Sequence, residues 1–443
     1  MQDTAFTYSY PFPSEFRQHP HDADLRLASF NPHIETTHFF DAEICNPPLL
    51  SRHLSLLHKV IQTHFVKPMP AQLDPVMTCN EQMLRFEGFS TCCGVYVRLD
   101  ARTDAFSIKH LGRGTTNVDF NAPMQSAIAM LASSKKANLK VGTDEIMLEK
   151  DGESVREKRV QLPVRWLKGF GEVQNLQSSL DFMFSISSVK ALPFFRSIPS
   201  GRGPSQYLYI TKHGDGLRAS SIAKNDAVRV SGLSRLKGLE SLLSRDSILS
   251  IWCNNDLGVS AWSVKTELGH FTLLLSPDLY RGFSGEGRLL SQLLKDKTIN
   301  AQIRSQLHWQ NNIKVDQLAT RLGKNEETVT TALQQLSAEG LLGFDLGQQS
   351  YYHRELPFNL KRIDQIQPRL KNAKRLLEDN RVVKLNSGLS RSYFKVKSQD
   401  TDYLVTFSEQ DEQCSCPWYS RYRNQRGPCK HILAARLFME DMK

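Results

Sequence analysis

The sequence lacks any apolar stretch of membrane-spanning length, and its N-terminus lacks a basic segment followed by an apolar run. A transmembrane helix needs about 20 consecutive apolar residues, and a secretory signal needs both terminal features. Cysteines are also few, because the 443 residues contain only eight, and their spacing forms no disulfide framework. We therefore expect a cytoplasmic protein that has no membrane partner and works in a reducing compartment.

Catalytic motifs are incomplete in this sequence. Residues 112–116 are rich in glycine but lack the Gly-Lys-Ser/Thr ending with which a P-loop holds phosphate and Mg²⁺. Residues 282–286 follow the pattern of a nucleophile elbow around Ser284, except that Glu286 stands where glycine is required. We predict that the chain is not an enzyme. A hydrolase in the N-terminal domain is a weaker alternative, because catalytic triads are assembled in space.

The composition and the spacing of apolar residues indicate a folded protein of mixed class. Hydrophobic residues make up 40% and charged residues 23% of the chain, which is typical of a globular protein. Prolines interrupt the first 80 residues, apart from a helix that the apolar spacing predicts at 49–61. From residue 86 onwards alternation predicts strands, among them a hairpin formed by 94–99 and 105–110. Predicted helices lie between the strands without a βαβ rhythm, so the fold class is α+β.

A helix-turn-helix pattern follows further along the chain. Residues 315–336 predict two helices joined at Gly323, with Asn325 as the cap of the second, and 340–354 predict a two-stranded wing. The region resembles a winged helix-turn-helix module. The predicted exposed side chains of the second helix are acidic, hydroxyl or amide groups: Glu326, Glu327, Thr330, Thr331, Gln334 and Gln335. Because acidic groups repel phosphates, we favour a structural or protein-binding role over the recognition of a DNA sequence.

Positive charge is concentrated near the C-terminus. The formal net charge is +10, and from residue 359 to the end there are seventeen Lys or Arg against ten Asp or Glu. Most of this excess lies in 359–384, which predicts a basic helical connector that attracts phosphates or an acidic protein surface. The alternative for this segment is an ordinary solvated helix face.

The most specific pattern is a set of metal ligands, in which Cys414 and Cys416 are followed by Cys429 and His431. Three thiols and one imidazole bind Zn²⁺ with four protein ligands and leave no position for water, which marks a structural metal. The first pair follows a predicted strand, and the second pair lies at the start of a predicted helix. We therefore predict one structural zinc ion in this segment.

The C-x-C pair, a spacer and the C-x-H pair, preceded by a predicted hairpin and followed by a helix of small residues, resemble the SWIM-type zinc finger over about 380–440. The resemblance assigns the metal to the same four residues. Together with 281–287, 353–358 and 426–431, it makes the chain similar to bacterial SWIM-finger proteins. That group occurs with MoxR-type AAA+ ATPases and von Willebrand A-domain proteins, which implies partners that remodel other proteins.

The segment between the two ligand pairs alternates arginines with aromatic rings. The candidate contacts to a protein partner, DNA or RNA are Trp418, Arg421, Tyr422, Arg423, Arg426 and Lys430. Arginines and rings together supply the phosphate contacts and stacking surfaces that bind single-stranded nucleic acid. The alternative is that the rings pack against the hairpin while the arginines neutralise an anionic zinc site. The sequence leaves both interpretations open.

These patterns predict a chain of five parts. The parts are an irregular N-terminal segment at 1–80, an α+β domain at 81–285, a winged helix-turn-helix-like domain at 286–358, the basic helical connector at 359–384 and the SWIM zinc finger at 385–443. The first hypothesis for function is a zinc-binding adaptor whose C-terminal half engages a protein or nucleic-acid partner. The alternative is a DNA-binding regulator that uses both the winged helix and the finger.

Overall fold

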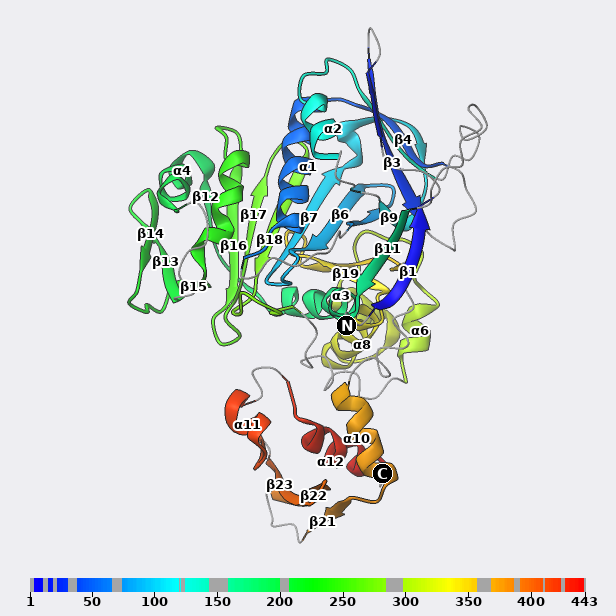
Figure 1. Cartoon of the computed structure of the whole chain (residues 1–443), viewed down its shortest axis with the longest axis vertical. Helices are drawn as coiled ribbons and strands as arrows, with labels where there is room; N and C mark the ends of the chain where they lie inside the picture. The colour runs from blue at the N-terminus through cyan, green and yellow to red at the C-terminus, as the bar shows by residue number, and fades with distance from the viewer. Residues whose placement is uncertain are drawn as a thin grey trace.

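The computed structural model describes residues 4–10, 15–18, 22–30, 38–65, 74–118, 120, 124–142, 158–199, 207–283, 298–356, 368–385, 391–408, 411–423 and 427–441. These residues form helices and several sheets, so the mixed α+β class is confirmed. They pack around two separate hydrophobic cores (Figure 1). The larger core runs from Ala23 to Leu356, and the smaller core runs from Leu370 to Ala435.

A 13-stranded sheet organises the larger core, with the strand order β12-β16-β17-β18-β7-β6-β5-β9-β3-β10-β4-β8 and with β2 paired to β3. The strands are β2 (Glu15–Gln18), β3 (Ala23–Phe30), β4 (His38–Ile44), β5 (Val76–Cys79), β6 (Met83–Phe89), β7 (Val95–Arg102), β8 (Phe106–Leu111), β9 (Gly114–Val118), β10 (Asn138–Gly142), β12 (Asp181–Ser187), β16 (Ile248–Asn254), β17 (Val259–Lys265) and β18 (Gly269–Leu275). Strands β3 and β10 pair in parallel, whereas their neighbours in the sheet pair antiparallel.

Smaller sheets and helices surround this sheet. Before residue 298, two smaller sheets are formed by β1 (Thr4–Tyr10) paired with β11 (Lys158–Pro163), and by β13 (Tyr207–His213) between β14 (Gly216–Ser220) and β15 (Val228–Ser231). The helices of this part include α1 (Pro47–Gln62), α2 (Met124–Leu131), α3 (Val164–Gln177), α4 (Ser188–Ser197) and the 3₁₀ helix η3 (Leu233–Leu242). Helix α1 lies against β6 and β7 (Figure 1), with Leu50, Leu54 and Leu57 fully buried at helical spacing. The helix predicted at 49–61 is therefore confirmed.

The described residues among the first 80 are not irregular, which corrects the prediction. They contain β1 to β5 and α1, and β3 lies inside the large sheet. Pro47 and Pro48 occupy the first positions of α1, where a missing N–H leaves no helical hydrogen bond unmade. Asn46 caps this helix by accepting a hydrogen bond from the Leu49 N–H at 3.1 Å. These two prolines therefore begin a helix and do not interrupt one. Pro75 is buried and directly precedes β5, and the other prolines of this segment lie outside the described residues.

The hairpin predicted from 94–99 and 105–110 is also wrong. Both segments are strands, and the short 3₁₀ turn η1 (Thr103–Ala105) joins them. However, β7 pairs with β6 and β18, whereas β8 pairs with β4. Strand β7 is buried at every position before Arg102, as expected for a central strand. Alternation identified the strands but carried no information about their partners.

Residues 298–356 contain the predicted helices and strand pair. The elements are α6 (Asn300–Arg304), α7 (Val315–Leu322), α8 (Glu326–Ala338), β19 (Leu342–Asp345) and β20 (Ser350–His353). Gly323 ends α7 in the left-handed region with a φ of 62°, which favours glycine. Asn325 then caps α8 by accepting a hydrogen bond from the Thr328 N–H at 2.8 Å. The local sequence signals were therefore sufficient to predict these helices and strands.

These elements do not form a separate domain, which corrects the division predicted at 286. Their apolar residues belong to the larger core, α8 packs on α3, and both strands of the β19–β20 hairpin are buried. Buried polar groups fix the hairpin to the large sheet. The Arg85 guanidinium lies 3.9 Å from the centre of the Tyr352 ring, and Arg354 forms an ion pair with Glu87 on β6. Buried charged residues therefore join two parts of one core.

The smaller core contains α10 (Pro368–Glu378), β21 (Val382–Lys384), β22 (Arg391–Ser398), β23 (Thr401–Ser408), β24 (Glu412–Cys414), α11 (Pro417–Tyr422) and α12 (Lys430–Asp441). We call these elements the zinc module. Its four strands pair antiparallel in chain order, and the hairpin predicted around 399–400 is present as β22 and β23. Among the described helices, none has the length and apolar character needed to cross a membrane.

The predicted connector at 359–384 is part of this module from Pro368 onwards. Helix α10 packs on α12 and buries Leu370 and Ala373, and β21 pairs with β22. Pro368 begins the helix instead of breaking it. The buried apolar positions are spaced at helical intervals between basic side chains, so the high charge of the segment concealed a packed face.

Candidate metal centre

Cys414, Cys416, Cys429 and His431 come together in the zinc module, as the sequence predicted. One ligand atom from each residue lies within 4.8 Å of the others. The His431 Nδ1 atom is 3.7 Å from Cys414 Sγ and 3.9 Å from Cys429 Sγ. All four residues are at most 5% exposed. Within the part of the chain that the structure describes, no other group of three or more His, Cys, Asp or Glu side chains is arranged to hold a metal.

One strand end and two helix starts place the four ligands. Cys414 is the last residue of β24, and its pairing with Val405 on β23 sets the direction of its side chain. Cys416 is the N-cap of α11, with Pro417 as the first helical residue. Cys429 directly precedes α12, and His431 lies in the first turn of that helix. The turn and the helix start inferred from the spacing therefore hold the two halves of the site.

Backbone N–H groups point at two of the sulfur atoms. The Tyr419 N–H donates to Cys416 Sγ at 3.4 Å, and the Ile432 N–H donates to Cys429 Sγ at 3.5 Å. The hydrogen bonds with Cys414 and then with Cys429 hold the pKa of Cys416 far below that of an ordinary thiol. Donation to Cys416 raises the pKa of Cys414 in turn. The low pKa of Cys416 favours its thiolate, which is the form that binds zinc.

The imidazole of His431 is held by stacking. Its ring lies on the Tyr403 ring with centroids 4.3 Å apart and with 23° between the planes. Nδ1 faces the sulfur atoms, whereas Nε2 is buried and has no hydrogen-bond partner among the described residues. Metal ligation through Nδ1 places the ring proton on Nε2, and the stacked ring of Tyr403 fixes the orientation that a hydrogen bond usually fixes. Four soft or borderline donors in a closed, buried set fit Zn²⁺.

The rings between the ligand pairs are packed. Arg369 of α10 places its guanidinium 4.5 Å from the centre of the Trp418 ring and donates to Pro428 O at 3.1 Å. The Trp418 and Tyr422 ring centroids are 4.5 Å apart, and Trp418 Nε1 is buried. These contacts favour the interpretation in which Trp418 belongs to the fold of the module. The guanidinium of Arg369 therefore covers a face of the Trp418 ring on which a base would otherwise stack.

The cations of this segment differ in exposure. Arg421 and Arg423 are exposed, Lys430 is half-buried, and Arg426 lies outside the described residues. Sequence reasoning missed two residues of the site, Arg369 and Tyr403. The alternation of the hairpin predicted that one of its faces packs on the zinc helix but did not single out Tyr403, and nothing distinguished Arg369 from the other basic residues around it. Contacts from the exposed arginines to nucleic acid remain a prediction.

Helix α8 is less exposed than predicted, and Gln335 is the main correction. Its side chain is fully buried, and its Oε1 accepts a hydrogen bond from Asn300 Nδ2 at 2.8 Å. The neighbouring Gln334 O accepts a hydrogen bond from Asn175 Nδ2 on α3 at 3.2 Å. Glu326 is exposed, as predicted. The acidic end of α8 is therefore its most accessible part, because Thr330, Thr331 and Gln334 are half-buried and the rest of the second half packs inside the larger core.

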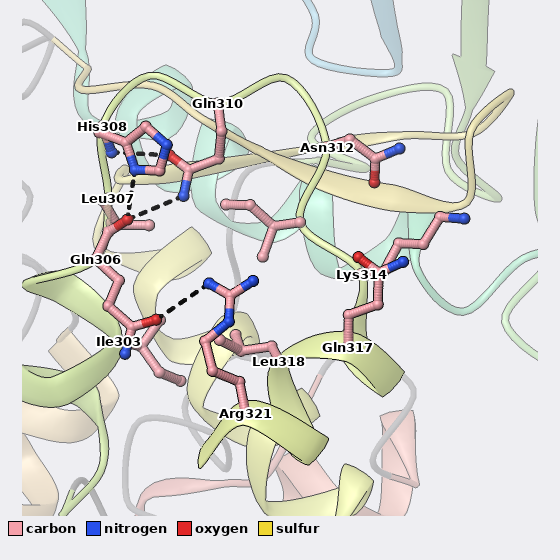
Figure 2. A pocket seen from close by; sticks show the side chains of 11 residues that line it. Ile303, Gln306, Leu307, His308, Gln310, Asn312, Lys314, Gln317, Leu318 and Arg321 are labelled. Atoms are coloured by element: carbon pink, nitrogen blue, oxygen red, sulfur yellow. Dashed lines mark hydrogen bonds between the residues drawn. The ribbon is translucent and has the colours of Figure 1, made fainter.

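A pocket of about 200 Å³ lies between α6, α7 and the chain that joins them. Figure 2 shows Arg321 pointing into this pocket, where it donates to Gln306 Oε1 at 3.5 Å. The lining residues are apolar, amide or basic: Ile303, Gln306, Leu307, His308, Gln310, Asn312, Ile313, Lys314, Gln317, Leu318 and Arg321. This lining offers no carboxylate, hydroxyl or thiol nucleophile for hydrolysis. Ser284, the residue of the incomplete elbow, lies outside the described residues.

Comparison with known proteins identifies one segment. Residues 403–436 match the family model described as SWIM zinc finger, and they include all four ligands. The predicted zinc cofactor is therefore confirmed by the match and the buried ligand cluster. No curated protein matches the chain. A solved structure titled "C-terminal region of FEN-1 bound to A. fulgidus PCNA" covers 54% of this chain and 98% of its own at 11% identity, but its TM-score of 0.32 supports no argument about fold or function.

Proposed function

We propose that the chain is a non-enzymatic adaptor, in which zinc holds together a C-terminal module that binds a partner protein. The observation that carries this proposal is a closed, buried Cys₃His site inside a module that has its own hydrophobic core. A metal with four protein ligands has no open position for substrate or water, so its contribution is to folding. The zinc is then the means by which a small module keeps one fixed surface.

The helices α7 and α8 and the hairpin β19–β20 support a winged-helix-like arrangement with a structural role. A winged helix that reads DNA needs its second helix free to enter a major groove about 12 Å wide. Here α8 packs on α3, and the hairpin that would form the wing is buried. The accessible end of α8 carries Glu326 and Glu327, which repel phosphate. These features favour the adaptor over the DNA-binding regulator.

The partners implied by the family resemblance are a MoxR-type AAA+ ATPase and a von Willebrand A-domain protein. We test them with the full chain, purified with zinc and mixed with those two proteins from the same host. Complex formation is followed by analytical size exclusion. The variant Cys416→Ser removes one zinc ligand, whereas Cys45→Ser removes an exposed cysteine outside the module and serves as the control.

The adaptor proposal expects a complex with the wild-type chain and with Cys45→Ser, and none with Cys416→Ser. A complex that forms equally well with Cys416→Ser, after metal analysis has shown that its zinc is lost, contradicts a role for the module in binding. Binding of single-stranded DNA, with no binding of either protein, favours a nucleic-acid partner instead.

A further inference from the structure

The zinc module exposes its large apolar side chains on one face only. In the described part of 368–441, the large hydrophobic residues that are exposed are Val383 (49%), Leu385 (38%) and Leu404 (46%). All three belong to the sheet of the module, on strand β21, just after it and on strand β23. The opposite side of this sheet packs on α12 and buries Phe394, Val396 and Val405, so the two faces are distinct.

The register places the exposed groups side by side. Val383 pairs with Lys395 and Lys395 pairs with Leu404, so these three residues form one row across three strands. The Leu385 N–H donates to Tyr393 O, which puts the next row beside the first. Neighbouring strands lie about 4.8 Å apart, so the aliphatic side chains flank β22 on both sides. We call Val383, Leu385, Tyr393, Lys395, Lys397 and Leu404 the outer face.

The outer face is positively charged along its middle strand. Arg391, Lys395 and Lys397 alternate on the exposed side of β22, as residues two apart in a strand must. On the same side of β21 to β23, the one carboxylate is that of Asp402, whose Oδ2 lies 3.3 Å from Lys395 Nζ. Both members of that pair are about half exposed, so the pair is weak and can exchange partners. A net positive strand between two aliphatic flanks is complementary to a surface that is both acidic and apolar.

We propose that the outer face is the docking site for an acidic, apolar segment of the partner protein. This inference rests on the adaptor function and assigns its binding surface. Carboxylates of the segment pair with the lysines of β22, while its apolar side chains cover Val383, Leu385 and Leu404. Specific interfaces combine a desolvated apolar centre with charges that set orientation, and the outer face supplies both.

A protein segment fits this face better than nucleic acid does. Single strands bind sheets through aromatic rings on which the bases stack, and Tyr393 is the one aromatic residue on the exposed side of β21 to β23. Aliphatic side chains gain little from a base but bury well against leucine or phenylalanine. The charge of the outer face attracts both ligands, so the aliphatic flanks are what distinguishes them.

The test is a selection of random peptides displayed on phage against the zinc-loaded full chain. An enriched peptide is then synthesised, and its Kd is measured by fluorescence anisotropy. The two test variants are Val383→Ser/Leu404→Ser, which removes the flanks, and Lys395→Gln/Lys397→Gln, which removes the charge. Ile222→Ser replaces an apolar residue that is 70% exposed outside the zinc module and is the matched control. A thymidine oligonucleotide is titrated in parallel, and zinc content is measured for every variant.

We expect enriched peptides to contain Asp or Glu together with Leu, Ile or Phe. The double serine variant should weaken their binding at least tenfold, since about 1.4 kcal/mol of lost apolar burial corresponds to a factor of ten. The glutamine variant should weaken it as well, and Ile222→Ser should not. Enrichment of basic or uncharged peptides, or equal binding to the serine variant, overturns the proposal. So does oligonucleotide binding that depends on the lysines but not on the flanks.

The two proposals fail separately. If Cys416→Ser loses the partner complex while the outer-face variants keep both zinc and the complex, the adaptor proposal stands and the assignment of its surface is wrong. If Cys416→Ser keeps the complex, the adaptor proposal itself is wrong, whatever peptides the selection enriches.

Discussion

The buried ion pair between Glu87 and Arg354 gives the sharpest test of how the larger core is organised. Both side chains are fully buried, and Arg354 is also held by Phe170 O, which accepts a hydrogen bond at 3.2 Å. Tyr96 donates its hydroxyl to the other oxygen of Glu87 at 2.6 Å. Arg354→Met leaves the Glu87 carboxylate buried without its cation. Breaking a buried pair from one side costs about 3–5 kcal/mol, and we expect a loss of that size in the free energy of unfolding.

The measurement is urea unfolding of the full chain, followed by far-ultraviolet circular dichroism and by the fluorescence of the buried Trp166 and Trp262. The double variant Glu87→Gln/Arg354→Met should recover most of the loss, because no unpaired charge stays buried. Arg102→Met is the matched control. Its pair with Asp104 is more than half exposed and screened by solvent, so removal should leave the free energy of unfolding nearly unchanged.

Two results would refute this reasoning. A cost below about 1 kcal/mol for Arg354→Met would mean that the pair is hydrated in solution and does not join the hairpin to the sheet. A separate early transition of residues 298–356, with the large sheet still folded, would restore the division into two domains that the sequence predicted.

Three further predictions concern single residues. Cys416→Ser should abolish zinc binding in metal analysis and unfold the zinc module while the larger core stays folded, since the binding free energy of structural zinc is on the order of 10 kcal/mol. Burial lowers the pKa of His53 to about 4, whereas the pKa of this side chain in the unfolded chain is about 6.5. Between these two pH values the unfolded chain binds more protons than the folded chain, so the free energy of unfolding should fall by about 3 kcal/mol as pH decreases from 6.5 to 4. The melting temperature should depend less on pH over this range in His53→Gln than in the wild-type chain. Asn325→Ala should lose the cap of α8 and cost about 1 kcal/mol in urea unfolding.

The zinc module was predictable because its information is local. The four ligands lie within a short stretch, and few chemical functions need three thiols and an imidazole at that spacing. The alternation of apolar and polar residues predicted the β22–β23 hairpin correctly, because two strands joined by a tight turn pair antiparallel with each other. The packing role of α10 was not predicted, because most of its residues are charged or polar. Its buried contacts are made by a few apolar residues, among them Leu370 and Ala373.

The larger core was less predictable because its contacts join distant residues. Strands β3 and β10 pair in parallel across more than a hundred residues, and no local signal identifies such a partner. The buried charged residues of this core were not predicted either. Arg85 and Arg98 have the composition of surface positions, yet both are buried on the sheet, where Arg98 Nη1 donates to Phe344 O at 2.7 Å. The burial of these arginines could not be predicted without the position of the β19–β20 hairpin, which supplies some of their partners.

Under the proposed adaptor function, one core provides the fold and the other the binding surface, for a physical reason. The ion pairs of Arg85 with Asp345 and of Glu87 with Arg354 form only when the β19–β20 hairpin is docked, so they specify one position of the helices α7 and α8 and keep α8 away from any groove. The proposed partner would then bind to another surface. The zinc module is small, and a core of that size is marginal without a cross-link. Zinc supplies the missing stability through four buried side chains, which allows Val383, Leu385 and Leu404 to stay on the outer face instead of entering the core.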